Sequence, residues 1–173
     1  DDIELLKGLE CNLGNDLGEI DLPQSLLAQM DIVLLGIHKN TTRNKPKEFY
    51  TECLVQAIKA NPCINIITHP NDPDFPVDYE ILAKTALNHD VAIEINNSKT
   101  AGKIASPDST IKLLRACMNI GCSIAVNSDA HVISELGQDN AVTPYLKELD
   151  FPEDLVITNN KERALKFINK KRV

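Results

Sequence analysis

The feature that most constrains this chain is a regular alternation of short apolar runs with segments of helical period. The runs are rich in Ile and Val and nearly continuous, which is typical of strands covered on both faces, as in parallel sheets. They occupy 3–12, 31–38, 63–69, 91–96, 122–128 and 155–158. Most begin about 27–32 residues apart, the length of one strand–helix unit. The sequence therefore predicts an α/β fold with parallel strands.

Helices are predicted between these runs. The segment 78–89 places its apolar residues at i, i+3, i+4, i+7 and i+8, which is one face of a helix. Ser106-Pro107 combines an N-cap with proline at the first helical position. Further helices are expected over 47–60, about 140–149 and from Asn159-Asn160 onward. A (βα) barrel and a doubly wound open sheet both fit this order, although no glycine-rich nucleotide-binding loop follows a strand.

Length and charge limit the classes of function. We expect one domain over 1–173, and the net charge of −7 argues against general binding of nucleic acid or of an anionic membrane. An anionic substrate is still allowed, because bound divalent cations reverse the local potential. No apolar run approaches the roughly 18–20 residues of a membrane span, and no signal-like segment is seen. Five cysteines without a Cys-x-x-Cys pair are expected to be reduced thiols in a cytoplasmic protein, with a zinc–thiolate site as the alternative.

Polar residues with metal-binding side chains stand at or near the carboxyl ends of four predicted strands. They are Glu10, His38, His69, Asp129 and His131. In parallel α/β folds that edge is where ligands bind, and these side chains are ligands of Zn²⁺, Mn²⁺ or Fe²⁺. A single histidine there is commonly a structural residue, but three of the four histidines share this position. The fourth, His89, stands where a helix ends and receives no chemical role.

Two further positions are candidates for supporting roles. In the run 91–96, strand alternation places Glu94 and Asn96 on the same face. A carboxylate in so apolar a run is costly unless it is paired, so Glu94 either orients a metal-bound histidine or pairs with a lysine or arginine. Arg43, in the basic loop 39–47, is a candidate phosphate ligand or a solvated loop residue.

Five segments together resemble the PHP (polymerase and histidinol phosphatase) superfamily in order and spacing. They are 8–12, 36–38, 67–70, 91–98 and 127–131. The resemblance is closest to the small stand-alone phosphatases of the YcdX type and covers essentially the whole chain. It implies a distorted seven-stranded TIM-like barrel that hydrolyses phosphate esters with a cluster of up to three metal ions. Histidinol phosphatase and polymerase-associated exonuclease are alternatives within the superfamily.

By this resemblance, each candidate side chain has a distinct role. Glu10 would bridge two metals, and His38 and His69 would complete the ligation of one of them. Asp129 would bind the other bridged metal and His131 a third. Glu10 and Asp129 would thus act directly in catalysis. The metals would most commonly be Zn, with Mn or Fe as alternatives, and the partner a small phosphorylated substrate.

The chain departs from the superfamily at its beginning, where a His-x-His strand and a second histidine-bearing strand are expected. By the resemblance, two strand–helix units, on the order of 60 residues, are lacking. Only the metal held by Glu10, His38 and His69 would keep its full set of protein ligands. We therefore expect the chain alone to be poorly active. The competing hypothesis, from a different class, is a non-catalytic structural remnant.

Overall fold

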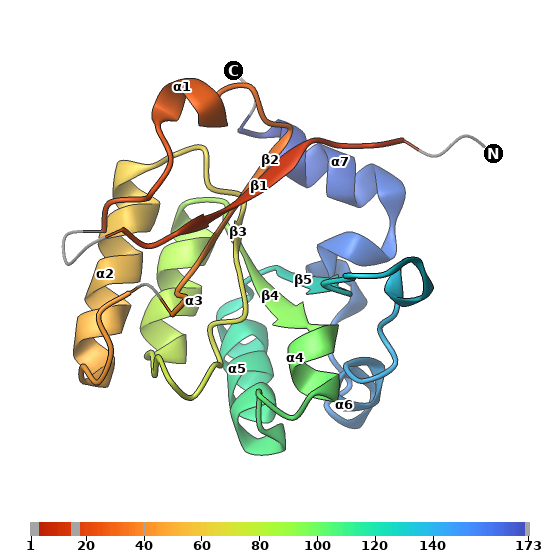
Figure 1. Cartoon of the computed structure of the whole chain (residues 1–173). Coiled ribbons are helices and arrows are strands. Elements are labelled where there is room, and N and C mark those ends of the chain that lie inside the picture. Colours follow the sequence, from red (N-terminus) through yellow and green to blue (C-terminus); the bar gives the residue numbers. More distant parts are fainter. Residues whose placement is uncertain (1–3, 15–17, 40, 172–173) are drawn as a thin grey trace.

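A parallel sheet of five strands forms the centre of the protein (Figure 1). The computed structural model describes residues 4–14, 18–39 and 41–171. The strands are β1 (Gly8–Asn12), β2 (Ile32–Gly36), β3 (Ile66–Ile67), β4 (Ala92–Asn96) and β5 (Ile124–Asn127). Their order in the sheet is β1-β2-β3-β4-β5, and every neighbouring pair is parallel. The predicted α/β class is confirmed.

The strand order distinguishes the two architectures that fit the sequence. Each strand pairs with the next one along the chain, whereas a doubly wound sheet reverses direction at a switch point. Within the described residues the sheet is open, with β1 and β5 at its two edges. The described strands therefore show a singly wound order but no closed barrel.

All five predicted helices are present. The helices are α1 (Gln24–Leu27), α2 (Lys47–Ala60), α3 (Tyr79–Asn88), α4 (Asn97–Ala101), α5 (Pro107–Ile120), α6 (Thr143–Glu148) and α7 (Lys161–Asn169). As predicted, Ser106 caps α5 by accepting from the Ser109 N–H at 3.1 Å, and Asn160 caps α7. The short helices α1 and α4 were not expected. None of these helices has the length and apolar character that a bilayer crossing needs within the described residues.

The predicted strand at 155–158 is wrong. Two 3₁₀ turns, η2 (Glu153–Leu155) and η3 (Ile157–Asn159), occupy this segment, and only Val156 makes a bridge, to Ile124. The physical reason is local: the N–H groups of Leu155 and Val156 donate to the carbonyls of Pro152 and Glu153 rather than to a neighbouring strand. For the first run, predicted as 3–12, residue 3 lies outside the described residues.

The two faces of the sheet have different covers. The helices α2, α3 and α5 lie on one face and enclose the main core (Figure 1). On the other face, which we call the α7 face, Ile66, Ala92 and Ala125 pack against Ile157 and Phe167. Four of the five cysteines are buried, and none of the five is in a disulfide within the described residues.

Alternation along the strands divides the α7 face into two zones. Ala92 lies in the apolar zone, so Glu94 and Asn96 point to the same side nearer the carboxyl end of β4. Glu10 is paired with Leu34, which also packs on this face. The apolar zone therefore lies near the amino ends of the strands, and the polar zone lies near their carboxyl ends.

We predict that Phe167→Ala destabilises the fold by about 3 kcal/mol, because this buried side chain holds α7 on the sheet. The free energy of unfolding in urea measures the effect. Ile81→Ala, on the exposed side of α3, serves as the control and changes stability by less than about 1 kcal/mol. Equal effects of the two substitutions would contradict the packing of α7 on this face.

Candidate metal centre

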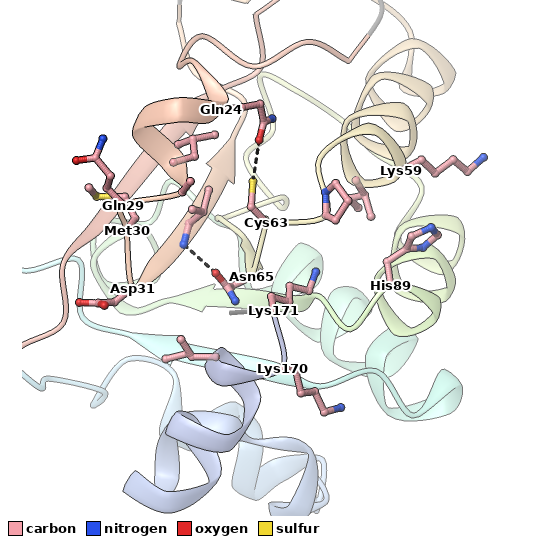
Figure 2. A pocket seen from close by; sticks show the side chains of 16 residues that line it. Gln24, Gln29, Met30, Asp31, Lys59, Cys63, Asn65, His89, Lys170 and Lys171 are labelled. Carbon is pink, nitrogen blue, oxygen red and sulfur yellow. Dashed lines mark hydrogen bonds between the residues drawn. The ribbon is translucent and has the colours of Figure 1, made fainter. Parts of the chain in front are cut away.

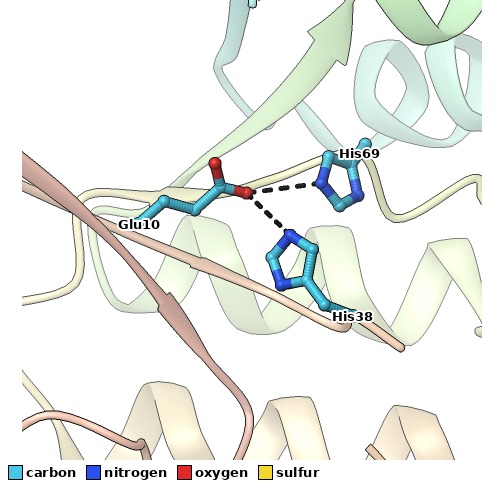
Figure 3. A group of neighbouring side chains, drawn as sticks. All are labelled: Glu10, His38 and His69. Carbon is cyan, nitrogen blue, oxygen red and sulfur yellow. Dashed lines mark hydrogen bonds and ion pairs between the residues drawn. The ribbon is translucent and has the colours of Figure 1, made fainter. Parts of the chain in front are cut away.

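The side chain of Glu10, from the middle of β1, meets those of His38 and His69, which follow the carboxyl ends of β2 and β3 (Figure 3). The Nε2 atom of His38 lies 3.1 Å from Glu10 Oε1, and the Nε2 atom of His69 lies 3.3 Å from the same oxygen. One potential ligand atom from each residue lies within 4.8 Å of the others. We call these three residues the triad.

Hydrogen bonds hold the Glu10 carboxylate in its charged form. Thr68 Oγ1 donates to Oε1 at 2.8 Å, so three donors reach one oxygen. The hydrogen bonds from His38 and His69 keep the pKa of Glu10 far below its usual range, although burial opposes them. Burial also lowers the pKa of His69, but the bond to Glu10 and the charge of Glu94 outweigh it, so the pKa is raised. Glu10 is therefore ionised at neutral pH.

Gly36, the last residue of β2, makes room for the triad. A Cβ atom at this position would lie 2.6 Å from His38 Cε1 and in even closer contact with the Thr68 hydroxyl. Such distances are not possible without a shift of both side chains. The absence of a side chain at Gly36 thus lets the His38 ring and the Thr68 hydroxyl lie against the backbone while both reach Glu10 Oε1.

The backbone of His69 adopts an unusual conformation that is held by a buried carboxylate. His69 has φ 30° and precedes Pro70, whereas residues before proline favour an extended backbone. Its N–H donates to Glu94 Oε2 at 2.9 Å, and both residues are buried. This hydrogen bond fixes the main chain that carries the least exposed side chain of the triad.

The other partners of Glu94 are side-chain amides. Asn127 Nδ2 donates to Oε1 at 2.8 Å, and Asn96 Nδ2 donates to Oε2 at 3.2 Å. Burial raises the pKa of Glu94, and these donors oppose that rise. Within the described ranges no lysine or arginine pairs with Glu94, so the alternative of a structural ion pair is wrong. Glu94 supports His69 through its main chain.

The triad fits a divalent transition metal. With bonds of about 2.0–2.1 Å in a tetrahedral arrangement, neighbouring ligand atoms are about 3.3 Å apart. The Glu10 oxygen lies 3.1 and 3.3 Å from the two imidazole nitrogens. Two imidazoles and one carboxylate are also a donor set that suits Zn, Mn or Fe. The described residues contain no other group of three such side chains, which leaves the zinc–thiolate alternative without support.

Asp129 and His131 lie at the same edge but outside the triad. The backbone of Asp129 is left-handed, with φ 52°, so the strand direction of β5 does not continue to His131. Asp129 Oδ2 accepts from Asn96 Nδ2 at 3.2 Å, which connects it to Glu94. The His131 side chain is 78% exposed, and its Nδ1 lies 2.8 Å from the Asp129 carbonyl oxygen. Their roles as ligands of further metals stay predictions.

His89 behaves as predicted. It is the C-cap residue of α3, and its Nδ1 lies 2.9 Å from the Thr85 carbonyl oxygen. It takes no part in the triad.

The chain resembles proteins named "Probable phosphatase" over nearly its whole length. One from Shewanella sediminis is 33% identical over 172 residues, which are 99% of this chain and 70% of the relative. One from Tolumonas auensis is 32% identical over 169 residues, covering 97% and 68% of the two chains. One from Caldicellulosiruptor saccharolyticus is 33% identical over 168 residues, covering 97% and 70%.

The chain belongs to this family of probable phosphatases. No family model matches the sequence, so the assignment depends on these relatives.

In this member of the phosphatase family, a hollow of about 280 Å³ opens beside the triad. It is lined by His38, His69, Lys39 and Lys99, together with Asp72, Asp74, Phe75 and Ile37. Arg43, the candidate phosphate ligand, is exposed in the loop between β2 and α2 and is not part of this lining. The role of Arg43 stays a prediction.

A wider hollow of about 810 Å³ lies at the opposite ends of the strands (Figure 2). Asn65, just before β3, accepts there from the Val33 N–H at 2.9 Å, and Cys63 Sγ lies 3.8 Å from Gln24 Oε1. These contacts join neighbouring segments of the chain. Because ligands of parallel α/β folds bind at the carboxyl ends of the strands, we place the functional site at the triad.

Four contributors to the site were missed by sequence reasoning: Gly36, Thr68, Lys99 and Asn127. Alternation offers a signal for Thr68, which follows Ile66 by two residues and lies on the α7 face with it. Asn127 is related to Ala125 in the same way. The sequence offers no such signal for Gly36, because the need for glycine there arises only from the close approach of the His38 ring and the Thr68 hydroxyl.

We predict that Glu94→Gln lowers stability by about 1–3 kcal/mol, because an amide NH₂ would then face one of the three N–H donors. Metal affinity is expected to fall about 10–100-fold through the loosened His69 backbone. Urea unfolding and metal titration measure these changes. Glu52→Gln, an exposed charge removal on α2, is the control. If Glu94→Gln kept the wild-type stability and the wild-type metal affinity, the claim that Glu94 supports the main chain of His69 would be refuted.

Proposed function

We propose that the protein is a metal-dependent phosphatase that hydrolyses small phosphomonoesters. The observation that carries the proposal is the triad at the carboxyl ends of the strands, in a chain that belongs to a family of probable phosphatases. The net charge of −7 further favours a small phosphorylated substrate over nucleic acid.

The triad would hold the metal, and Zn²⁺ is the ion we propose, with Mn²⁺ and Fe²⁺ as alternatives of similar ligand preference. When bound, such an ion polarises phosphoryl oxygens and lowers the pKa of a bound water toward neutrality. Glu10 contributes its ionised carboxylate, and Glu94 fixes the main chain of His69. Asp129 and His131 are proposed to hold further ions at the same edge, where Asn96 connects Asp129 with Glu94.

We also propose that the sheet belongs to a TIM-like barrel of the PHP type. The strictly sequential strand order and the placing of α2, α3 and α5 on one face support this, because a barrel carries its helices outside the strands (Figure 1). The α7 face would then be the interior side, and the triad would lie at the mouth of the barrel.

Chelation and one pair of histidine variants test the proposed activity. Metal content and hydrolysis of p-nitrophenyl phosphate are measured before and after dialysis against EDTA. We expect at least one transition metal per chain, and a low hydrolysis rate that EDTA abolishes and the metal restores. His69→Ala is expected to lose metal and roughly a hundredfold or more in rate. His89→Ala, the control at the end of α3, keeps both.

A wild-type rate that is indifferent to EDTA, or a His69→Ala protein with full metal and full rate, would refute the proposal. Tight metal binding without hydrolysis of any phosphomonoester would instead identify a non-catalytic module. A preference for single-stranded DNA over small esters would favour the exonuclease alternative.

A further inference from the structure

The hollow beside the triad contains a lysine side chain without a partner among the described residues. Lys99 is half-buried and lines the hollow together with His38 and His69. Its ammonium group forms no ion pair within 4.0 Å with any residue of the described ranges. It lies close enough to His69 for its charge to lower the pKa of that imidazole, against the larger effects that raise it. The Lys99 ammonium group is thus held next to the triad and is available to bind an anion.

The position of Lys99 is fixed by the same network that supports the triad. Lys99 is the third residue of α4, and its N–H donates to Asn96 Oδ1 at 2.8 Å. Thr100 Oγ1 donates to the Asn96 carbonyl at 2.7 Å. Asn96 is buried, and its amide group donates to Glu94 and Asp129. The start of α4 is therefore tied to the residues behind His69, so the placement of Lys99 is coupled to that of the triad.

The charges around the hollow argue for a direct contact rather than a general attraction. Lys39 also lines it, but Asp72 and Asp74 line it as well and oppose the approach of an anion. With two lysines against two carboxylates, these four side chains have no net charge. An anion can bind there only where an ammonium group touches it, next to the cation that the triad would hold.

We propose that Lys99 binds the phosphoryl oxygens of the substrate, beside the metal held by the triad. This inference rests on the proposed phosphatase function and assigns phosphate recognition to α4 instead of to Arg43 in the loop after β2. Because an ammonium group binds phosphate as a point charge, arginine at position 99 retains the attraction and methionine removes it at similar length.

Inorganic phosphate is the probe, and isothermal titration calorimetry on the metal-loaded chain is the measurement, so the result does not depend on turnover. We expect Lys99→Met to weaken phosphate binding about tenfold or more, and Lys99→Arg to stay within about threefold of the wild type. Lys84→Met, an exposed lysine on α3, is the matched control and leaves binding unchanged. Metal content is expected to be unchanged or higher in Lys99→Met, because the substitution removes a positive charge that repels a metal cation in the wild type.

The inference is overturned if Lys99→Met binds phosphate as tightly as the wild type, or if the metal-loaded wild type binds none. It is also overturned if Lys99→Met loses phosphate binding only together with its metal. Failure of the proposed function has a different signature. In that case phosphate binding depends on Lys99 while no phosphomonoester is hydrolysed, whereas unchanged phosphate binding with intact hydrolysis removes only the role of Lys99.

Discussion

The arrangement of the site depends on one buried carboxylate, that of Glu94. A charged group in the middle of a buried strand is tolerated only when hydrogen bonds replace water, and here every protein partner found is an N–H donor. These donors come from the main chain after β3, from the end of β4 and from the end of β5. One side chain therefore ties three strand ends together at the edge where the triad lies.

The same hydrogen bonds explain why the triad and Lys99 are positioned together. Glu94 holds His69, and Asn96 connects Glu94 to Asp129 and to the first turn of α4. The amino-terminal zone of the α7 face is filled by apolar side chains, so it gives this polar zone a rigid base. Parallel α/β architecture explains this division along the strands. Apolar side chains near the amino ends stabilise the fold, and polar side chains gather near the carboxyl ends.

Much of this could be predicted from the sequence because it depends on local periodicity. The alternation in 91–96 placed Glu94 and Asn96 on one face, and their side chains are joined at 3.2 Å. The positions of Glu10, His38 and His69 at or near the ends of predicted strands indicated that their side chains would meet, and they do. Periodicity failed where the backbone leaves regular structure: Asp129 has a positive φ, and Val156 makes a single bridge between two 3₁₀ turns. The position of Lys99 was missed because it depends on how Asn96 begins α4.

The central claim is that one metal ion is shared by Glu10, His38 and His69. Anomalous diffraction from crystals of the metal-loaded protein, recorded above and below the absorption edge of the metal, tests it most directly. The account predicts an anomalous peak about 2.0–2.2 Å from a Glu10 carboxylate oxygen and from one ring nitrogen of each histidine. A metal bound only elsewhere, with both histidines still hydrogen-bonded to Glu10, would contradict it.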